Sequence, residues 1–319
     1  MTKDKYRGAL LGLACGDALG TTLEFQTPGT FTKIDDIVGG GPFGLEAGQW
    51  TDDTSMALCL ADSLIVKRDF DLEDQINRYL DWYKNGYMSS TGSCFDIGMT
   101  VSSALRSYMR TGNPISGSTH EQSSGNGSIM RLVPVPMAFI SNPKKAIELS
   151  GKSSISTHGS QMCIDSCRYM GGLIVGALLG HSKGDILGHM YTPLGDGWKQ
   201  GLHSRVSEVA SGSFKDKMPP EIKGTGFVID SLEAALWAFY NSDSFEEGCL
   251  MAVNLGNDAD TTGAVYGQIA GAYYGMSDIP ENWLKKLAKR DLIVDIADSL
   301  KDISTVRRFD RNKPSLITM

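Results

Sequence analysis

Two short acidic clusters stand out in this 319-residue chain, because each groups carboxylates and hydroxyls at the start of an apolar stretch. The first cluster is Thr51-Asp52-Asp53-Thr54, and the second, about two hundred residues later, is Asp258-Ala259-Asp260-Thr261-Thr262. Carboxylate and hydroxyl oxygens are hard ligands, which suit Mg²⁺ or Mn²⁺ better than Zn²⁺. The pattern raises the hypothesis of a hydrolytic site with two metal ions.

Helix capping is the competing interpretation of both clusters. Residue spacing predicts helices over 55–66 and 260–274, so each cluster lies at a helix N-terminus, where Asp and Thr are favoured. One capping aspartate per helix would need no other explanation, but two at each of two helices exceed what capping requires. Residues two apart on a helix point to nearly opposite sides, so Asp258 and Asp260 must straddle the helix start to share an ion. We favour metal ligation on this pattern.

Apolar residues recur at three- and four-residue spacing along most of the chain, which is typical of helices. The predicted helices cover 6–19, 55–66, 72–83, 97–109, 162–179, 231–240 and 246–255. Sustained alternation of apolar and polar residues, the mark of strands, is scarce. The sequence predicts an all-α fold in one domain over 1–319, with a helical C-terminal extension at 280–319.

Glycines four residues apart mark one face of three predicted helices. The three ribs are Gly8, Gly12, Gly16 and Gly20; Gly172, Gly176 and Gly180; and Gly263, Gly267, Gly271 and Gly275. A helical glycine costs about 1 kcal/mol relative to alanine, so the repeat predicts a compensating close approach between helices. Membrane helices use similar ribs, but Asp17 and Arg168 beside these segments favour a tightly packed soluble bundle.

Composition argues against several classes of partner. The net charge of −7 gives no general electrostatic reason to bind nucleic acid or an anionic membrane. The N-terminus lacks the apolar core of a signal peptide, and charged residues and glycines are expected to interrupt each later apolar run before spanning length. We therefore expect a cytoplasmic protein whose six cysteines are mostly buried free thiols. The stretch 181–226 should be a long surface excursion, either a rim over a site or a solvated loop.

Other segments carry weaker chemical signals. The stretch 123–128 is rich in glycine and serine before an apolar run, so it predicts a helix start that could cradle phosphate, with an ordinary turn as the alternative. It matches neither the dinucleotide fingerprint nor the P-loop. Glu24 and Asp96 are carboxylates among apolar residues, and His158 is either a ligand, a general base or a structural residue. Nucleophile-elbow and zinc patterns are absent from the sequence.

Taken in order, these segments resemble the ADP-ribosylglycohydrolases, of the dinitrogenase-reductase-activating glycohydrolase and ADP-ribosylarginine hydrolase type. The matching segments are GDALG (16–20) followed by Glu24, WTDDT (50–54), FDIG (95–98), GNGSIMR (125–131), THG (157–159), LEAALWAF (232–239) and NLGNDADTTGAVYGQIAGAYYG (254–275). The resemblance runs from residue 6 to about 276. It implies a compact, single-domain orthogonal helical bundle with two Mg²⁺ or Mn²⁺ ions at the bottom of an ADP-ribose cleft.

The resemblance also implies roles for individual residues. The metal ligands would be Thr51, Asp52, Asp53, Asp258, Asp260 and Thr261. The substrate would contact Gly125, Asn126, Gly127, Ser128, His158 and Phe227, while Glu24 and Asp96 would act near the ribose as catalytic carboxylates. Phe227 stands where the family often has Tyr, so a ring remains for stacking but a hydroxyl is lost.

The implied reaction is hydrolysis of the N-glycosidic bond between ADP-ribose and an arginine of a protein, and a cognate ADP-ribosyltransferase is an implied partner. Three alternatives remain open on the sequence. The first is another linkage, such as ADP-ribosylserine, O-acetyl-ADP-ribose or a nucleic-acid base. The second is a binder or immunity protein that occludes an ADP-ribosyltransferase toxin. The third, a generic two-metal phosphohydrolase, fits the resemblance least well.

Overall fold

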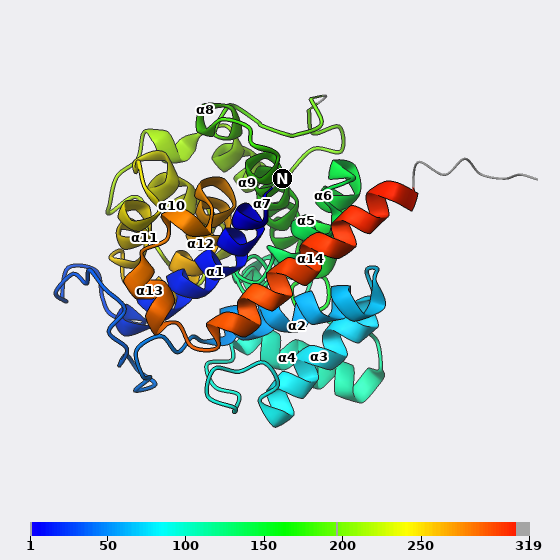
Figure 1. Cartoon of the computed structure of the whole chain (residues 1–319), viewed down its shortest axis with the longest axis horizontal. Helices are drawn as coiled ribbons and strands as arrows, with labels where there is room; N and C mark the ends of the chain where they lie inside the picture. Colours follow the sequence, from blue (N-terminus) through cyan, green and yellow to red (C-terminus); the bar gives the residue numbers. More distant parts are fainter. Residues whose placement is uncertain (1, 196, 311–319) are drawn as a thin grey trace, which may run out of the picture.

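Two antiparallel helices, α1 (Lys3–Gly20) and α12 (Ala259–Tyr274), form the centre of the fold (Figure 1). The structure is a computed structural model that describes residues 2–195 and 197–310. The other helices are α2 (Asp52–Lys67), α3 (Leu72–Asn85), α4 (Met99–Thr111), α5 (Pro134–Phe139), α6 (Pro143–Ser154), α7 (Gln161–Leu179), α8 (Lys183–Ile186), α9 (Ser204–Ala210), α10 (Val228–Tyr240), α11 (Phe245–Val253), α13 (Glu281–Lys286) and α14 (Arg290–Asp310). The described residues form no strand, so the predicted all-α fold is confirmed.

The glycine ribs of α1 and α12 face each other along their whole length. A methyl group added at Gly12 or Gly16 would lie less than 3.0 Å from the backbone of α12, and additions at Gly263 and Gly267 would meet α1 in the same way. Only hydrogen atoms fit between these two backbones. The predicted close approach of helices is confirmed for this pair, and it sets the C-terminal half of α1 beside the N-terminus of α12.

The third rib has a different neighbour. Gly176 of α7 faces the Tyr191 side chain, and Gly172 makes ordinary contacts with Pro193 and Ile147, all from outside the α1–α12 pair. Gly180 ends α7 in a left-handed conformation. The predicted close approach of two helices is therefore wrong for this rib, because Ile147 of α6 makes only ordinary contact with Gly172 and a loop aromatic, Tyr191, fills the space at Gly176.

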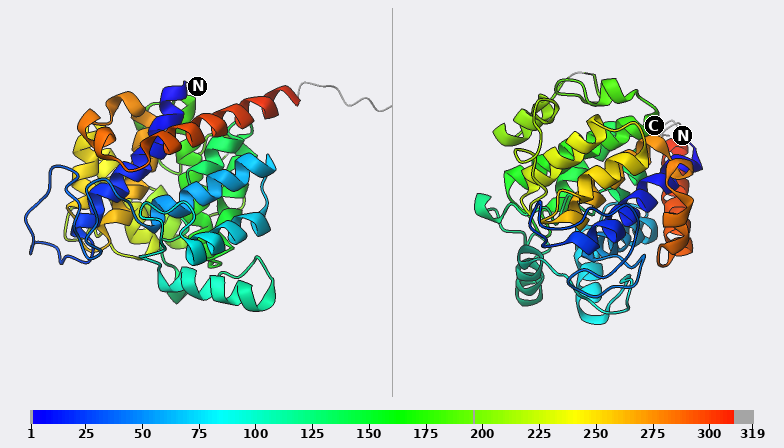
Figure 2. Two further views of the ribbon diagram at one scale, coloured as in Figure 1. Left: turned by 60° about the horizontal axis from the view of Figure 1, so that its bottom comes forward. Right: turned by 90° about the vertical axis from the view of Figure 1, so that its left-hand side faces the viewer.

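The remaining helices surround this central pair. The long helix α14 crosses the outside of α1 and α2, while α4 lies at the periphery (Figure 2). One continuous apolar cluster joins helices from α1 to α14 and includes the buried rings of Trp50, Trp82 and Trp283. The C-terminal extension comprises α13 and α14 within the described residues, and 311–319 lie outside them.

Helix α7 corrects an expectation from the sequence. Among the described residues it is the one helix long and apolar enough to cross a membrane by length and composition, although it carries Asp165 and Arg168. These two residues form an ion pair of 2.6 Å, and 83% of the most apolar window is buried inside the fold. The expectation that charged residues interrupt every apolar run before spanning length is therefore wrong for α7, which is a buried helix of the core.

Two loop expectations also change. Residues 127–131 form consecutive turns, and the next helix, α5, begins only at Pro134, so the predicted helix start after residue 128 is wrong. The stretch 181–226 holds α8 and α9 and buries Val206 and Phe214, so it is folded onto the core rather than a solvated loop. The six cysteines are free, and all except the half-buried Cys94 are buried, as expected.

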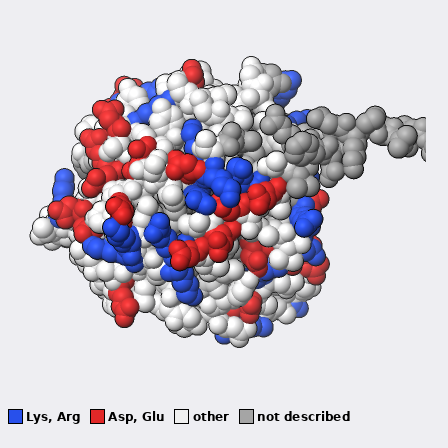
Figure 3. All heavy atoms as spheres, viewed as in Figure 1, with Lys and Arg blue, Asp and Glu red and all other residues white. Residues whose placement is uncertain are grey.

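The surface carries both signs of charge in mixture. In Figure 3, acidic and basic side chains are interspersed over the face formed by α1, α13 and α14. Asp298 of α14, for example, accepts hydrogen bonds from both Lys3 and Arg7 of α1. Other acidic side chains are buried, among them Asp17, Asp53 and Asp260.

Candidate active site

The first acidic cluster is held in place by a carboxylate from another helix. Asp17 of α1 accepts hydrogen bonds from the backbone N–H groups of Thr51 and Thr54, at 2.9 and 3.0 Å, and from their hydroxyls, at 2.9 and 2.6 Å. Asp17 thus caps α2 from outside, since Thr51, the N-cap residue, makes no side-chain cap bond of its own. Asp52 and Asp53 in the first turn of α2 are consequently not needed for capping.

The second cluster, at the start of α12, likewise contains an N-cap residue whose side chain does not cap the helix. Asp258 is the N-cap residue but makes no side-chain cap bond, so its carboxylate is free for another role. Asn126 donates a hydrogen bond of 2.6 Å to Asp258 Oδ2 and another of 2.8 Å to Ser231 Oγ. Asn126, predicted to contact substrate, therefore also orients a predicted metal ligand. At neither helix start does capping account for the acidic residues.

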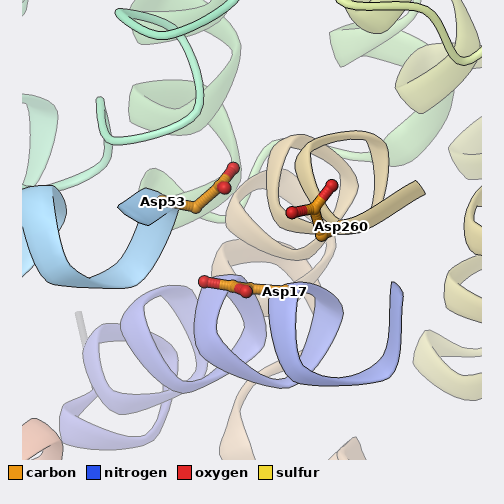
Figure 4. A group of neighbouring side chains, drawn as sticks. All are labelled: Asp17, Asp53 and Asp260. Carbon is orange, nitrogen blue, oxygen red and sulfur yellow. The ribbon is translucent and has the colours of Figure 1, made fainter. Parts of the chain in front are cut away.

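The two helix starts and α1 bring their carboxylates to one point (Figure 4). Asp17, Asp53 and Asp260 are all buried and offer oxygens that lie within 4.8 Å of one another. A second group with the same property comprises Glu24, Asp258 and Asp260. Asp260 belongs to both groups, so two neighbouring sites share one carboxylate.

Glu24 and Asp96 reach the site from loops. Asp96 has φ 52°, and two neighbours of the site, Phe25 and Asn257, have φ 61° and 56°. Non-glycine residues rarely adopt this left-handed conformation, and its cost must be offset by surrounding bonds. Phe25 N–H donates to Asn257 O at 2.6 Å and Asn257 N–H to Gln26 O at 2.8 Å, which ties the Glu24 loop to the start of α12.

A cavity of about 750 Å³ opens above these carboxylates. The predicted site residues that line it are Glu24, Asp52, Asp96, Gly125, Asn126, Gly127, His158, Asp258, Asp260 and Thr261. Thr51 and Asp53 are fully buried beneath the lining, and Ser128 is buried behind it with a hydrogen bond from Ser154. Phe227 lies outside the lining, where the Arg205 guanidinium is 5.9 Å from its ring centre.

The glycine loop beside this cavity has two free backbone donors, of which Gly127 belongs to the lining and Ser128 lies buried just behind it. The N–H groups of Gly127 and Ser128 donate no hydrogen bond to any described residue. Asn126 N–H donates to Gly226 O at 3.1 Å and Val228 N–H to Ser124 O at 3.0 Å, so the loop is fixed by the segment before α10. Free, fixed N–H groups at a cavity wall are suited to bind the oxygens of an anion.

The carboxylates of this site repel one another in a buried setting. Burial first, and neighbouring carboxylates second, raise the pKa of Glu24 to about 10. The same causes raise the pKa of Asp96 to about 7 and hold the pKa of Asp52, Asp53 and Asp260 well above the ordinary aspartate value. None of the ion pairs formed within 2–195 and 197–310 involves these groups.

Orphaned oxygens show that these residues fit divalent cations. Glu24 Oε2, Asp53 Oδ1 and Asp260 Oδ1 are buried and have no hydrogen-bond partner. Buried carboxylate oxygens without a proton donor are costly, and a hard cation would satisfy both their charge and their lone pairs. The donors are all oxygens, which suits Mg²⁺ or Mn²⁺ and not a thiolate-bound metal.

Asp17 is not among the predicted site residues, although it is the one charged residue within the first glycine rib. Its place in the site depends on the packing of α1 against the start of α2, which residue spacing does not reveal. Arg131 and Thr157 were also not singled out, although both lie in segments that were. Their contacts are decided by packing and have no local sequence signature.

The fold and the site together define the class. The family described as ADP-ribosylglycohydrolase matches residues 1–310, and the chain therefore belongs to the ADP-ribosylglycohydrolase family of hydrolases. The sequence resemblance to this family is confirmed.

Among its relatives, the chain is 41% identical to the ADP-ribosylarginine hydrolase Tri1 of Serratia proteamaculans, over 93% of this chain and 79% of the relative. It is 32% identical to the ADP-ribosyl-[dinitrogen reductase] glycohydrolase of Rhodospirillum rubrum, over 89% of this chain and 90% of the relative. A solved structure described as an ADP-ribosylglycohydrolase-related protein complex aligns with a TM-score of 0.83 at 41% identity, covering 95% of this chain and 98% of that one.

Proposed function

We propose that this protein hydrolyses the N-glycosidic bond between ADP-ribose and an arginine side chain of a protein, with two divalent cations, Mg²⁺ or Mn²⁺. The observation that carries the proposal is the convergence of three helices' carboxylates, with orphaned oxygens, at one end of a cavity whose wall offers free backbone N–H groups. The 41% identity to a protein named an ADP-ribosylarginine hydrolase supports arginine as the acceptor.

The cations would be held by the two acidic helix starts. Asp52, Asp53 and Thr51 from α2, and Asp258, Asp260 and Thr261 from α12, are the proposed ligands, and the site geometry adds Asp17 and Glu24 as neighbours. When bound, divalent cations supply positive charge that orients ribose hydroxyls and activates water.

The remaining steps belong to residues of the chain. The free N–H groups of Gly127 and Ser128 bind the diphosphate, and His158 lies beside them. Glu24 and Asp96 line the cavity. The charge of Asp96 helps to raise the pKa of Glu24, whereas a hydrogen bond with Glu24 lowers the pKa of Asp96, so a proton can be held at Glu24 while Asp96 accepts. We assign the proton transfers at the anomeric carbon to this pair, with the guanidinium leaving and ADP-ribose released.

A panel of defined conjugates tests the proposal. ADP-ribosyl-arginine, -serine, -cysteine and -glutamate are incubated with the enzyme and Mg²⁺, Mn²⁺ or a chelator, and free ADP-ribose is measured. We expect release from the arginine conjugate, abolished by chelator, by Asp52→Ala and by Asp258→Ala, while Asp302→Ala, an exposed carboxylate on α14, retains activity. Activity that resists chelator, or full activity in both site variants, would refute the two-metal proposal.

Two further arms separate the remaining roles. Asp96→Asn should bind ADP-ribose but lose turnover, and unchanged turnover would remove Asp96 from the chemistry. Release of ADP-ribose from the serine conjugate alone would indicate that the enzyme hydrolyses an O-glycosidic linkage instead. A modified protein also requires a cognate ADP-ribosyltransferase as its source, and co-expression with the enzyme should reverse the modification that such a transferase makes.

A further inference from the structure

A buried arginine lies directly behind the glycine loop of the cavity. Arg131 is 1% exposed and forms no ion pair with the described carboxylates. Its guanidinium lies 4.6 Å from the centre of the Tyr79 ring, donates to Gly127 O at 2.5 Å and donates to Thr157 Oγ1 at 2.7 Å. Burying a cation without a counter-ion is costly, so this position needs an explanation beyond packing.

The hydrogen bond to Gly127 O orients the loop. In a planar trans peptide the C=O of one residue and the N–H of the next point in opposite directions. Because the Gly127 carbonyl points to the buried Arg131, the N–H of Ser128 points the other way, and it has no partner among the described residues. Arg131 therefore keeps one of the proposed diphosphate donors turned away from the interior.

The hydrogen bond to Thr157 fixes a proton on the neighbouring ring. Thr157 Oγ1 is buried, accepts from Arg131 and lies 2.9 Å from His158 Nδ1. If Nδ1 carried a proton, the Thr157 hydroxyl would accept from both sides, and its own proton would have no acceptor in a dry place. The hydroxyl instead donates to Nδ1, which leaves the proton of a neutral imidazole on Nε2.

The other edge of the ring lies against the loop. A methyl group at Gly127 would be 2.8 Å from His158 Cε1, and one at Gly125 would be 3.3 Å from Nε2, so the two glycines make room for the imidazole. His158 lines the cavity, and its Nε2 has no hydrogen-bond partner among the described residues. An N–H at this position is available to a ligand.

The charge state of the ring follows from its neighbours. Burial first, and the positive charge of Arg131 second, lower the pKa of His158 to about 3. The other titratable groups in contact with the loop are Asp258, which accepts from Asn126, and the thiols of Cys163, which donates to Gly125 O, and Cys167, which donates to Ser128 Oγ. Burial raises the pKa of all three. The His158 ring is thus neutral at physiological pH, beside the Arg131 guanidinium.

We propose that Arg131 and Thr157 are positioning residues that fix His158 as its Nε2–H tautomer, so that this one N–H is a neutral donor to an oxygen of ADP-ribose held at Gly125–Ser128. The identity of the ligand rests on the proposed function, whereas the tautomer does not. In this arrangement the positive charge near the diphosphate resides on the Arg131 guanidinium, and the neutral imidazole contributes a directed N–H donor without a charge.

Thr157→Val and Thr157→Ser form a matched pair, because both preserve the approximate shape but only serine keeps the hydroxyl. Nitrogen-15 NMR of histidine-labelled full-length enzyme reports which ring nitrogen carries the proton, and the sequence has only five histidines. The signal lost in His158→Asn identifies the ring. Spectra are recorded from pH 5 to 8 with Mg²⁺, without and with ADP-ribose.

We expect the wild-type protein and Thr157→Ser to be protonated at Nε2 alone throughout this pH range. Thr157→Val should show Nδ1–H or a mixture, and its Kd for ADP-ribose should rise about 3- to 10-fold, as for one lost hydrogen bond. A wild-type ring protonated at Nδ1, a ring that titrates in this range, or a Thr157→Val ring unchanged from wild type would overturn the proposal. Failure of the wild-type protein to bind ADP-ribose would refute the proposed function and the ligand, but would leave the tautomer measurement standing.

Discussion

Replacing Asp53 with asparagine should stabilise the metal-free protein, because the carboxylate cluster opposes folding when no cation is bound. Asp17, Asp53 and Asp260 offer oxygens within 4.8 Å of one another. At an effective dielectric constant of about 20, two unit charges at that separation repel by about 3.5 kcal/mol, so Asp53 faces about 7 kcal/mol from its two neighbours.

Protonation limits this penalty. Adding a proton at pH 8 to a group with an ordinary pKa of 3.8 costs about 6 kcal/mol. Because protonation removes the repulsion, Asp53 can destabilise the folded metal-free protein by no more than this amount. The asparagine oxygen can still accept from the hydroxyl of Thr261, and its NH₂ group can donate where Oδ1 has no partner. We expect Asp53→Asn to raise the free energy of unfolding by about 2 to 5 kcal/mol without metal.

The same variant should lose the stabilisation that metal provides. A ligand present at 100 times its Kd stabilises the folded state by about 2.7 kcal/mol, and the variant should gain less than half of what the wild-type protein gains. The assay is urea unfolding followed by tryptophan fluorescence, in chelator and in Mg²⁺. Asp302→Asn, an exposed carboxylate, should change both values by no more than about 0.5 kcal/mol. An Asp53→Asn protein less stable than wild type in chelator would refute the reasoning.

Three further predictions follow from the same contacts. Asp17→Asn removes the same charge as Asp53→Asn, but it places an NH₂ group opposite two hydrogen-bond donors. In chelator, its free energy of unfolding should therefore be about 3 to 6 kcal/mol lower than that of Asp53→Asn. Equal stability of the two variants would contradict the capping role of Asp17. Folding raises the pKa of Asp96 from 3.8 to about 7, so the folded metal-free protein binds more protons than the unfolded chain. As the pH is increased from 5 to 7, the free energy of unfolding should therefore fall, by up to about 1.4 kcal/mol per pH unit from this group. Asp96→Asn should reduce this slope, as measured by urea titrations at each pH. Gly12→Ala should destabilise by about 1 to 3 kcal/mol or more in thermal unfolding because the added methyl meets the α12 backbone, whereas Gly172→Ala, with only ordinary contacts, should be neutral or stabilising.

Much of the secondary structure was predictable because helix formation depends on near neighbours. The spacing of apolar residues located α1, α2, α3, α7 and α12 to within a few residues. The prediction of a helix after residue 128 failed, because Pro134 sets the first turn of α5 and the preceding segment is held by Gly226 and Arg131. Those partners are distant in sequence, so their effect was not visible locally.

By itself, the sequence determined the all-α class, the two acidic helix starts and the family resemblance, since each is written in residue type and spacing. It also showed three glycine ribs, but not that α1 would pair with α12 while α7 faced Tyr191. Only that pairing sets Asp17 beside Asp53 and Asp260, turns Asp17 into the cap of α2, and leaves the carboxylates of Asp52 and Asp53 without a capping role. The tertiary structure decided this because the energy of a buried charge depends on what surrounds it in space, and those neighbours come from four separate segments of the chain.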